Sequence, residues 1–293
     1  MSISFENQVA IVTGGARGLG RAYAEALAAR GARVVIADLG GEGATTAAQI
    51  RATGGAAEAH EVDVSDFDAV SAMVDRVLDA HGRIDIALNN AGILRDKTFA
   101  KMALDDFRRV VEVHLMGSVN LCKAVWQPMR DCGYGRILLT SSSSGLYGNF
   151  GQSNYGAAKA AMLGLMNCLQ LEGERDGIRV NMILPSAATR MTDGLLDPEA
   201  ARLLAPERVA AGALFLVSGA APSRFAMAAG AGTFARVHVT EGEGIHLPDD
   251  ELTPEAVAAR FDAICDPAGA RAVENAFDQA GKLAARAVRA GAA

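Results

Sequence analysis

Short apolar segments alternate along the chain with longer segments of helical character, and this alternation restricts the fold more than any other feature. We expect strands at residues 9–12 and 33–37, a weak strand leading to 62–64, and strands at 84–88, 137–140, 179–184 and 234–239. A strand–helix–strand alternation favours a parallel sheet. The sequence therefore predicts an α/β, Rossmann-like doubly wound parallel sheet of about seven strands with helices on both faces. In such a sheet, ligands bind beyond the carboxyl ends of the strands.

A glycine-rich turn follows the first expected strand. It is Thr13-Gly14-Gly15-Ala16-Arg17-Gly18-Leu19-Gly20, and an Ala-rich helix follows to Arg30. Glycines at a strand-to-helix turn let the backbone approach a pyrophosphate, which the free N–H groups and dipole of the helix N-terminus attract. The spacing is G-x-x-x-G-x-G rather than G-x-G-x-x-G, so the turn alone is equally compatible with a bare tight turn.

Asp38 closes the second expected strand, close to the ~20 residues after the glycines where a ribose-binding carboxylate is expected. A carboxylate there accepts hydrogen bonds from both ribose hydroxyls and repels a 2′-phosphate, which favours NAD over NADP. Asp38 could instead be a turn or helix-cap residue. Arg17 argues the other way, because a cation in the glycine turn could pair with the phosphate. No basic residue follows Asp38, and we therefore predict NAD.

Polar residues follow other expected strands. Asp63, at a strand end, could meet the adenine amino group or merely flank a helix N-cap. Asn89 and Asn90 follow the fourth strand; their amides could bind ribose or brace the neighbouring strand, and we expect mainly the second. The loop 185–192 leaves the sixth strand and could cover a nicotinamide, or be a loop with two cap-forming threonines. These residues all lie at the strand ends where ligands bind.

Tyr155 and Lys159 are four residues apart, so they share one face of a helix. An ammonium near a phenol favours the phenolate and lowers the Tyr pKa from its usual ~10. Ser142 follows the apolar strand 137–140 and could hold a carbonyl or alcohol oxygen opposite the activated Tyr155. This arrangement indicates proton exchange with a carbinol, whereas Y-x-x-x-K by itself occurs often by chance.

A long helix is expected from 104 to 132, and His114 lies within it on an apolar stretch where a packed histidine is the ordinary interpretation. The helix that carries Tyr155 continues through the apolar residues 160–166, which indicates burial against a second subunit or against the protein's own core. The stretch 219–232, rich in Gly and Ala, is expected to be a mobile connection. Thr253 and Pro254 have the residue types of an N-cap and a first helical position.

Composition excludes several classes of function. Half of the residues are hydrophobic and 21% are charged, which favours a large core, and the net charge of −6 argues against nucleic-acid or anionic-membrane partners. The four cysteines have no metal-ligand spacing and are expected to be buried thiols in a reducing compartment; they are Cys122, Cys132, Cys168 and Cys265. We see no signal peptide and no apolar run long enough to span a bilayer, and we expect a cytoplasmic protein.

Taken together, these residues resemble the short-chain dehydrogenase/reductase family. The motifs stand in family order and at family spacing over about residues 7–240: Thr13-Gly14-x3-Gly18-x-Gly20, Asp38, Asn89-Asn90-Ala91-Gly92, Ser142, Tyr155-x3-Lys159 and Pro185. The resemblance implies that Tyr155 is the general acid/base, that Ser142 steadies the substrate oxygen, and that Lys159 lowers the Tyr155 pKa and holds the ribose. The expected NAD-binding residues are Gly14, Arg17, Gly18, Leu19, Gly20, Asp38, Leu39, Asp63, Val64, Asn90, Ala91, Gly92, Tyr155, Lys159, Pro185 and Ala188.

The chain also resembles one branch of that family, the (3R)-hydroxyacyl-CoA dehydrogenase modules of peroxisomal multifunctional enzymes of type 2, also called 17β-hydroxysteroid dehydrogenase type 4. The likeness is carried by residues 18–24, 38–41, 91–96, 147–152, 186–192, 253–257 and 264–266. The C-terminal matches carry most weight, because ordinary family members end near the last strand. The resemblance implies an NAD-binding domain at 1–240, a helical extension at 241–293 that packs on the same domain or its dimer partner, and a homodimer or homotetramer.

The chain departs from the wider family at His114, where Asn feeds a water-mediated proton relay; the branch also carries His. His114 could hold the same water, and we include it among the expected catalytic residues. Pro185-Ser186 replaces the usual Pro-Gly, and the segment after 38–41 is shorter than in the multifunctional enzymes. Hydratase and sterol-carrier domains are not in the sequence, so nothing in it demands a peroxisome.

The resemblance implies NAD-dependent oxidation of a (3R)-hydroxyacyl-CoA to the 3-oxoacyl-CoA, with Tyr155 as general base. Arg95, Lys97 and Lys101 could meet the CoA phosphates or be solvated surface. The alternatives are a hydroxysteroid or a steroid side-chain CoA thioester as substrate, and a regulator that binds NAD without turnover.

Overall fold

The computed structural model describes residues 2–188 and 197–291. They belong to two compact units, one up to Arg236 and the other from Val237 onward. All residues predicted for the cofactor or for catalysis belong to the first unit. Thr189 to Thr192, part of the loop predicted to cover a nicotinamide, lie outside the described residues.

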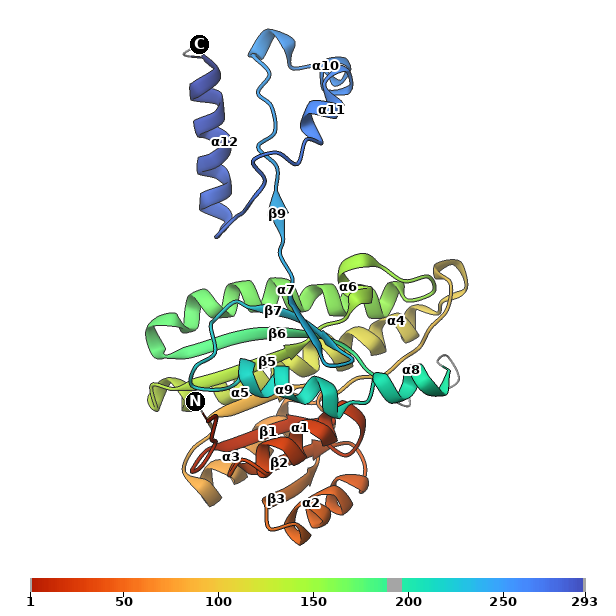
Figure 1. Ribbon diagram of the computed structural model, residues 1–293, viewed down its shortest axis with the longest axis vertical. Coiled ribbons are helices and arrows are strands. Elements are labelled where there is room, and N and C mark those ends of the chain that lie inside the picture. The colour runs from red at the N-terminus through yellow and green to blue at the C-terminus, as the bar shows by residue number, and fades with distance from the viewer. Residues whose placement is uncertain (1, 189–196, 292–293) are drawn as a thin grey trace. The chain divides into compact units, whose positions relative to one another are not determined.

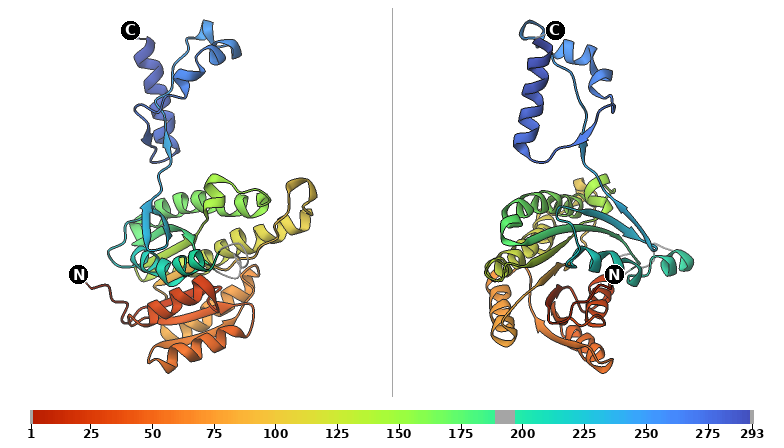
Figure 2. Two further views of the ribbon diagram at one scale, coloured as in Figure 1. Left: turned by 45° about the vertical axis from the view of Figure 1, so that its right-hand side comes forward. Right: turned by 60° about the vertical axis from the view of Figure 1, so that its left-hand side comes forward.

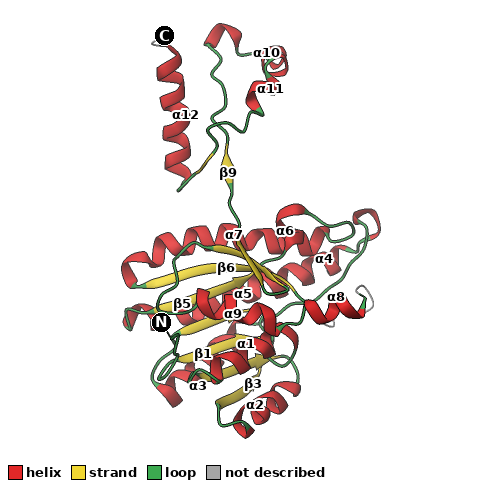
Figure 3. Ribbon diagram, viewed as in Figure 1, coloured by secondary structure: helices red, strands yellow, loops and turns green. Residues whose placement is uncertain are grey.

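An eight-stranded sheet forms the centre of the first unit (Figures 1 and 3). Its spatial order is β3-β2-β1-β4-β5-β6-β7-β8, and only β8 runs antiparallel to its neighbour. The direction of winding reverses between β1 and β4, which makes their carboxyl ends the expected ligand crevice. The strands are β1 (Val9–Thr13), β2 (Arg33–Asp38), β3 (Ala56–Glu61), β4 (Ile86–Asn89), β5 (Gly135–Thr140), β6 (Ile178–Ser186), β7 (Ala226–Gly230) and β8 (Thr233–Arg236). The predicted doubly wound fold is confirmed.

Helices cover both faces of this sheet, as the two views of Figure 2 show. On one face α1 packs against α2 and α9, and on the other α3 packs against α5 and α4 against α7. The helices of this unit are α1 (Gly18–Ala28), α2 (Glu42–Ala52), α3 (Phe67–His81), α4 (Leu104–Val111), α5 (Gly117–Asp131), α6 (Ser143–Tyr147), α7 (Ser153–Gly173), α8 (Pro198–Leu203) and α9 (Glu207–Leu216).

The helix predicted for 104–132 contains a widened turn. A π-helical turn, Glu112–Met116, connects α4 directly to α5, so that the three segments form one continuous helix. Such turns insert an extra residue into a helix and often occur at functional sites. His114 is at the middle of this one, a placement that periodicity along the sequence does not predict.

The C-terminal end of the sheet corrects the sequence prediction. The stretch 219–232 was expected to be a mobile connection, but it contains β7, whose residues pair in parallel with Met182 to Ser186 of β6. The sequence did not predict this strand, because β7 consists of Ala, Met and Gly rather than the β-branched residues that are typical of strands. The expected final strand at 234–239 is the exposed β8, Thr233–Arg236, which forms a hairpin with β7.

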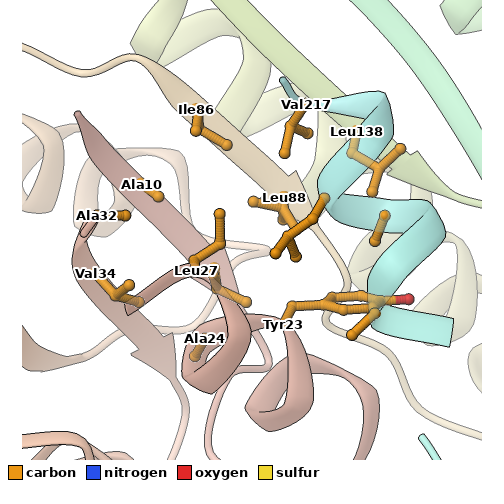
Figure 4. Packing of buried hydrophobic residues seen from close by; sticks show 14 of the residues in the cluster. Ala10, Tyr23, Ala24, Leu27, Ala32, Val34, Ile86, Leu88, Leu138 and Val217 are labelled. Atoms are coloured by element: carbon orange, nitrogen blue, oxygen red, sulfur yellow. The ribbon is translucent and has the colours of Figure 1, made fainter. Parts of the chain in front are cut away.

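Burial of apolar residues between the sheet and α1 and α9 forms the main core (Figure 4). Tyr23 and Leu27 of α1 are fully buried against Leu88 and Val217. Among the described residues the Tyr23 hydroxyl has no hydrogen-bond partner. Burial raises the pKa of Tyr23 well above its ordinary value, so this phenol is neutral and inert.

The second unit contains short elements and one long helix. They are β9 (Thr240–Glu241), α10 (Pro254–Ala259), α11 (Phe261–Ile264), β10 (Arg271–Ala272) and α12 (Ala276–Gly291). Thr253 caps α10 by accepting a hydrogen bond from the Ala256 amide at 3.1 Å, which confirms the predicted cap. Lys282 of α12 bonds Glu241 at 3.0 Å and so ties α12 to β9. In the described ranges no helix combines the length and hydropathy that crossing a membrane requires. The prediction of four buried cysteines is wrong: Cys122 is buried, but Cys132, Cys168 and Cys265 are exposed.

Replacing Tyr23 by Phe should leave the free energy of unfolding unchanged or raise it by about 1 kcal/mol, because it removes a buried hydroxyl without a partner. Leu27→Ala, in the same core, should lower it by about 2–5 kcal/mol. Urea denaturation of both variants measures these changes. A clear loss of stability in Tyr23→Phe would show that the hydroxyl is hydrogen-bonded in solution.

Candidate active site

A cavity of about 580 Å³ lies at the carboxyl ends of the parallel strands. Every residue predicted for the cofactor or for catalysis lines it, with three exceptions: Gly20, His114 and Ala188. Ala188 is nevertheless next to the cavity, since its amide donates to the carbonyl of Leu204, a lining residue, at 2.7 Å. The sheet thus assembles residues from strand ends far apart in sequence at one crevice.

The glycine turn between β1 and α1 leaves room for a ligand to approach the backbone. Gly14 has a φ of +61°, and a Cβ there would lie 2.8 Å from the Cα of Ala91. A Cβ on Gly20 would lie 2.1 Å from the carbonyl oxygen of Gly14. Arg17, the N-cap residue of α1, makes no side-chain capping hydrogen bond. A bare helix N-terminus behind a glycine turn fits the pyrophosphate of a dinucleotide.

Asn90 holds this turn in place. Its Nδ2 donates to the carbonyl oxygens of Thr13 at 3.1 Å and Gly14 at 3.2 Å. The Thr13 hydroxyl in return accepts from the amides of Asn90 and Ala91 at 3.0 and 3.2 Å. The expected bracing is therefore seen for Asn90, whereas Asn89 Nδ2 instead meets Cys122 Sγ of α5 at 3.6 Å. Binding of the ribose by Asn90 stays a prediction.

Asp38 and Arg17 occupy the expected ribose end of the cavity. Asp38 Oδ2 accepts from the amide of Ala16 at 3.0 Å, which orients the carboxylate beside the glycine turn. The guanidinium of Arg17 forms an ion pair with Glu42 at 2.9 Å. The cation that argued for a 2′-phosphate thus already has an acidic partner.

Asp63 lines the cavity together with Arg109, which the sequence analysis did not single out. Arg109 bonds Asp63 Oδ2 at 3.0 Å and the Ser65 hydroxyl at 2.9 Å, and Ser65 also donates to Asp63 Oδ1 at 2.6 Å. Although burial opposes them, these contacts hold the pKa of Asp63 below its ordinary value. No sequence motif marks Arg109, because its pairing depends on how α4 lies over the end of β3.

Ser142, Tyr155 and Lys159 meet at the other end of the cavity, as predicted. Ser142 is the N-cap of α6, where its hydroxyl accepts from the Ser144 amide at 3.2 Å, and this hydroxyl also lowers the pKa of Tyr155. Lys159 Nζ lies 5.8 Å from the centre of the Tyr155 ring and donates to the Thr140 carbonyl at 2.7 Å. Burial lowers the pKa of Lys159 to about 7.

The expected lowering of the Tyr155 pKa is not found in this structure. Burial raises the pKa of Tyr155, the neighbouring Ser142 hydroxyl lowers it in part, and the charge of Asp96 raises it further. Lys159 contributes little because it points to Thr140 and its own charge is disfavoured by burial. Burial therefore outweighs the neighbouring ammonium.

His114 packs edge-on against Tyr155, with ring centres 5.2 Å apart. Its Nε2 lies 2.8 Å from the carbonyl oxygen and 3.0 Å from the amide nitrogen of Ile93. Burial, reinforced by the charge of Lys159, lowers the pKa of His114 to about 3, so the ring is neutral. Within the described part of the chain, its buried Nδ1 has no partner. A role in holding a relay water stays a prediction.

Gly20→Ala should weaken dinucleotide binding severely and lower the free energy of unfolding by about 1–3 kcal/mol, because the Cβ overlaps the backbone of Gly14. Gly219→Ala is the matched control, since a Cβ there meets no atom within 4 Å. Dinucleotide titration and urea denaturation test both variants. Normal binding by Gly20→Ala would contradict the assignment of this turn.

Lys159→Met should make the free protein more stable at neutral pH, because it removes a charge that the buried site disfavours. The folded pKa of Lys159 is about 7 and its ordinary value is 10.5, so the penalty is complete below pH 7 and fades as pH rises toward 10.5. The stability difference between variant and wild type should shrink over that window. Urea denaturation of both proteins at several pH values measures this difference. A difference in stability that does not change between pH 7 and 10.5 would contradict the prediction.

Comparisons with known proteins agree with this geometry. Residues 8–199 match the sequence model of the short chain dehydrogenase family. The chain is 42% identical over 280 residues to mouse peroxisomal multifunctional enzyme type 2, and 38% over 276 residues to the peroxisomal hydratase-dehydrogenase-epimerase of Saccharomyces cerevisiae. Each alignment covers 90% of this chain, which spans 37% and 31% of the lengths of those relatives.

A solved structure of full-length peroxisomal multifunctional enzyme type 2 from Drosophila melanogaster superposes with a TM-score of 0.84 at 32% identity. The match covers 97% of this chain and 50% of that one. The relatives, the strand order and the glycine turn lead to one assignment. The chain belongs to the short-chain dehydrogenase family.

Proposed function

We propose that the protein oxidises the 3-hydroxyl of a (3R)-hydroxyacyl-CoA to the 3-oxoacyl-CoA with NAD. The observation that carries the reaction type is the meeting of Ser142, Tyr155 and Lys159 in one cavity with the glycine turn. The substrate class is supported by the resemblance to the dehydrogenase modules, which extends over the C-terminal unit. The cavity is large enough for part of such a substrate together with a nicotinamide.

The residues at the Tyr155 end have distinct roles in this proposal. Ser142 donates a hydrogen bond to the substrate oxygen, and Tyr155 takes the hydroxyl proton as general base. The carbinol carbon loses a hydride, for which bound NAD supplies the acceptor. In the free protein Ser142 favours the phenolate against burial, whereas Lys159, bonded to the Thr140 carbonyl, contributes little. In the reverse direction Tyr155 returns the proton to the carbonyl oxygen.

Two contacts support NAD over NADP. The Asp38 carboxylate stands at the end of β2 beside the glycine turn, where it would repel a 2′-phosphate. Arg17, the cation best placed to attract that phosphate, is paired with Glu42. For the CoA phosphates, Arg95 is partly engaged by Asp106 at 3.7 Å, which makes Lys97 and Lys101 the better candidates of the predicted three.

Initial rates with a panel of secondary alcohols test the proposal, each with NAD and with NADP. We expect (3R)-hydroxyacyl-CoA thioesters to give the highest kcat/KM, with NAD preferred. A preference of tenfold or more for steroid or steroid-CoA alcohols, equivalent to about 1.4 kcal/mol in the transition state, would replace this substrate with the alternative. Faster turnover of (3S) thioesters would contradict the stereochemical assignment.

Tyr155→Phe is the matched control for catalysis, since it removes only the hydroxyl that exchanges the proton. This variant should bind NADH normally and lose turnover of every substrate in the panel. Unchanged biological output from a variant without turnover would favour an NAD-binding regulator instead.

A further inference from the structure

A carboxylate stands near the reacting end of the cavity. Asp96 lines the cavity together with Ser142 and Tyr155, on the segment that follows β4. In the sequence, residues 91–96 carry part of the family likeness, but no motif assigns a role to Asp96. A negative charge at this position acts on any substrate that reaches Tyr155.

Hydrogen bonds hold Asp96 in a defined place. Gln152 Nε2 donates to Asp96 Oδ2 at 2.7 Å. The Gln152 carbonyl oxygen accepts from the Ser144 hydroxyl at 2.8 Å and from Asn149 Nδ2 at 3.0 Å, which fixes the orientation of its amide. Gln152 is the N-cap residue of α7 and precedes Tyr155 by one helical turn. The network therefore couples the position of Asp96 to the helix that carries Tyr155.

The backbone reinforces this arrangement. The Lys97 amide donates to the Gly151 carbonyl at 2.9 Å, and Asn154 Nδ2 donates to the Arg95 carbonyl at 3.0 Å. The segments before and after Asp96 are thus both bound to the start of α7. Asp96 is itself exposed, but these attachments hold it in place, and a carboxylate on a free loop would lack them.

No cation neutralises Asp96 in the described part of the chain. Its side-chain partner is the neutral amide of Gln152. The nearby Arg95 pairs instead with Asp106 at 3.7 Å. The negative charge of Asp96 acts on Tyr155 and raises its pKa. The reacting end of the cavity thus faces an uncompensated negative charge.

We propose that Asp96 is a specificity-determining residue that disfavours substrates with a negative charge next to the carbinol, so that the site accepts neutral esters and thioesters over free 3-hydroxy acids. In a 3-hydroxy acid the carboxylate is two bonds from the carbinol carbon, so it enters the same end of the cavity as Asp96. In a thioester the same carbon is uncharged. The inference rests on the proposed function in that Tyr155 receives the proton of a secondary alcohol.

Asp96→Asn tests the inference with three substrates: (3R)-hydroxybutyrate, its methyl ester and its N-acetylcysteamine thioester. The ratio of kcat/KM for the free acid to that for either neutral substrate should rise about fivefold relative to wild type, the size expected for a partly exposed charge. Asp96→Glu, which restores the charge, should return the ratio toward wild type. Asp105→Asn is the control, because Asp105 pairs with Arg108 and does not line the cavity. An unchanged ratio in Asp96→Asn overturns the inference.

Ultraviolet titration of Tyr155, with Tyr155→Phe as the subtracted reference, provides a readout that needs no substrate. The groups that face the phenol are Ser142, Lys159, His114 and Asp96, and only the last is changed. Asp96→Asn should lower the pKa of Tyr155, and Asp105→Asn should not. No shift would overturn the inference even if acyl-CoA thioesters proved not to be substrates. A shift together with inactive thioesters would contradict only the proposed substrate.

Discussion

The close approach of two turns, one after β1 and one after β4, is the constraint on which the rest of the site depends. The turns can meet because Gly14 and Gly20 carry no Cβ, and they are joined by the hydrogen bonds of Asn90 to Thr13 and Gly14. This contact closes the point where the winding of the sheet reverses. It leaves the N-terminus of α1 bare and directed at the crevice, which is where a pyrophosphate binds in folds of this kind.

Burial of ionisable groups is the second organising feature, and it lowers the stability of the folded protein. The site keeps Lys159 and His114 where water is scarce, and burial lowers the pKa of Lys159 to about 7 and that of His114 to about 3. A neutral His114 packs against the Tyr155 ring without adding a charge beside the phenol. Such an arrangement sacrifices folding stability for a preorganised reaction site. The charge of Asp96 likewise has two opposed effects. It raises the pKa of Tyr155, and in our proposal it disfavours negatively charged substrates.

The agreement between sequence and structure is best where a local signal has one interpretation. The apolar strands before Gly14, Asp38 and Ser142 were predicted, as were the bracing role of Asn90 and the cap at Thr253. The predictions failed where the signal was weak or depended on the environment. β7 was missed because its small residues show no strand pattern, and the lowered pKa of Tyr155 was inferred from helical spacing alone. Spacing places Lys159 near the ring, but it does not reveal burial or the competing bond to Thr140.

The sequence by itself determined the layered α/β fold, the family and the proximity of Ser142, Tyr155 and Lys159, because periodicity and motif spacing are local properties of the chain. The tertiary structure alone decided which polar residues face one another. The pairs Arg109 with Asp63, Arg17 with Glu42, and Gln152 with Asp96 join residues separated by 25 to 56 positions. Their contacts depend on how helices and loops lie over the strand ends, and no pattern of neighbouring residues encodes that arrangement.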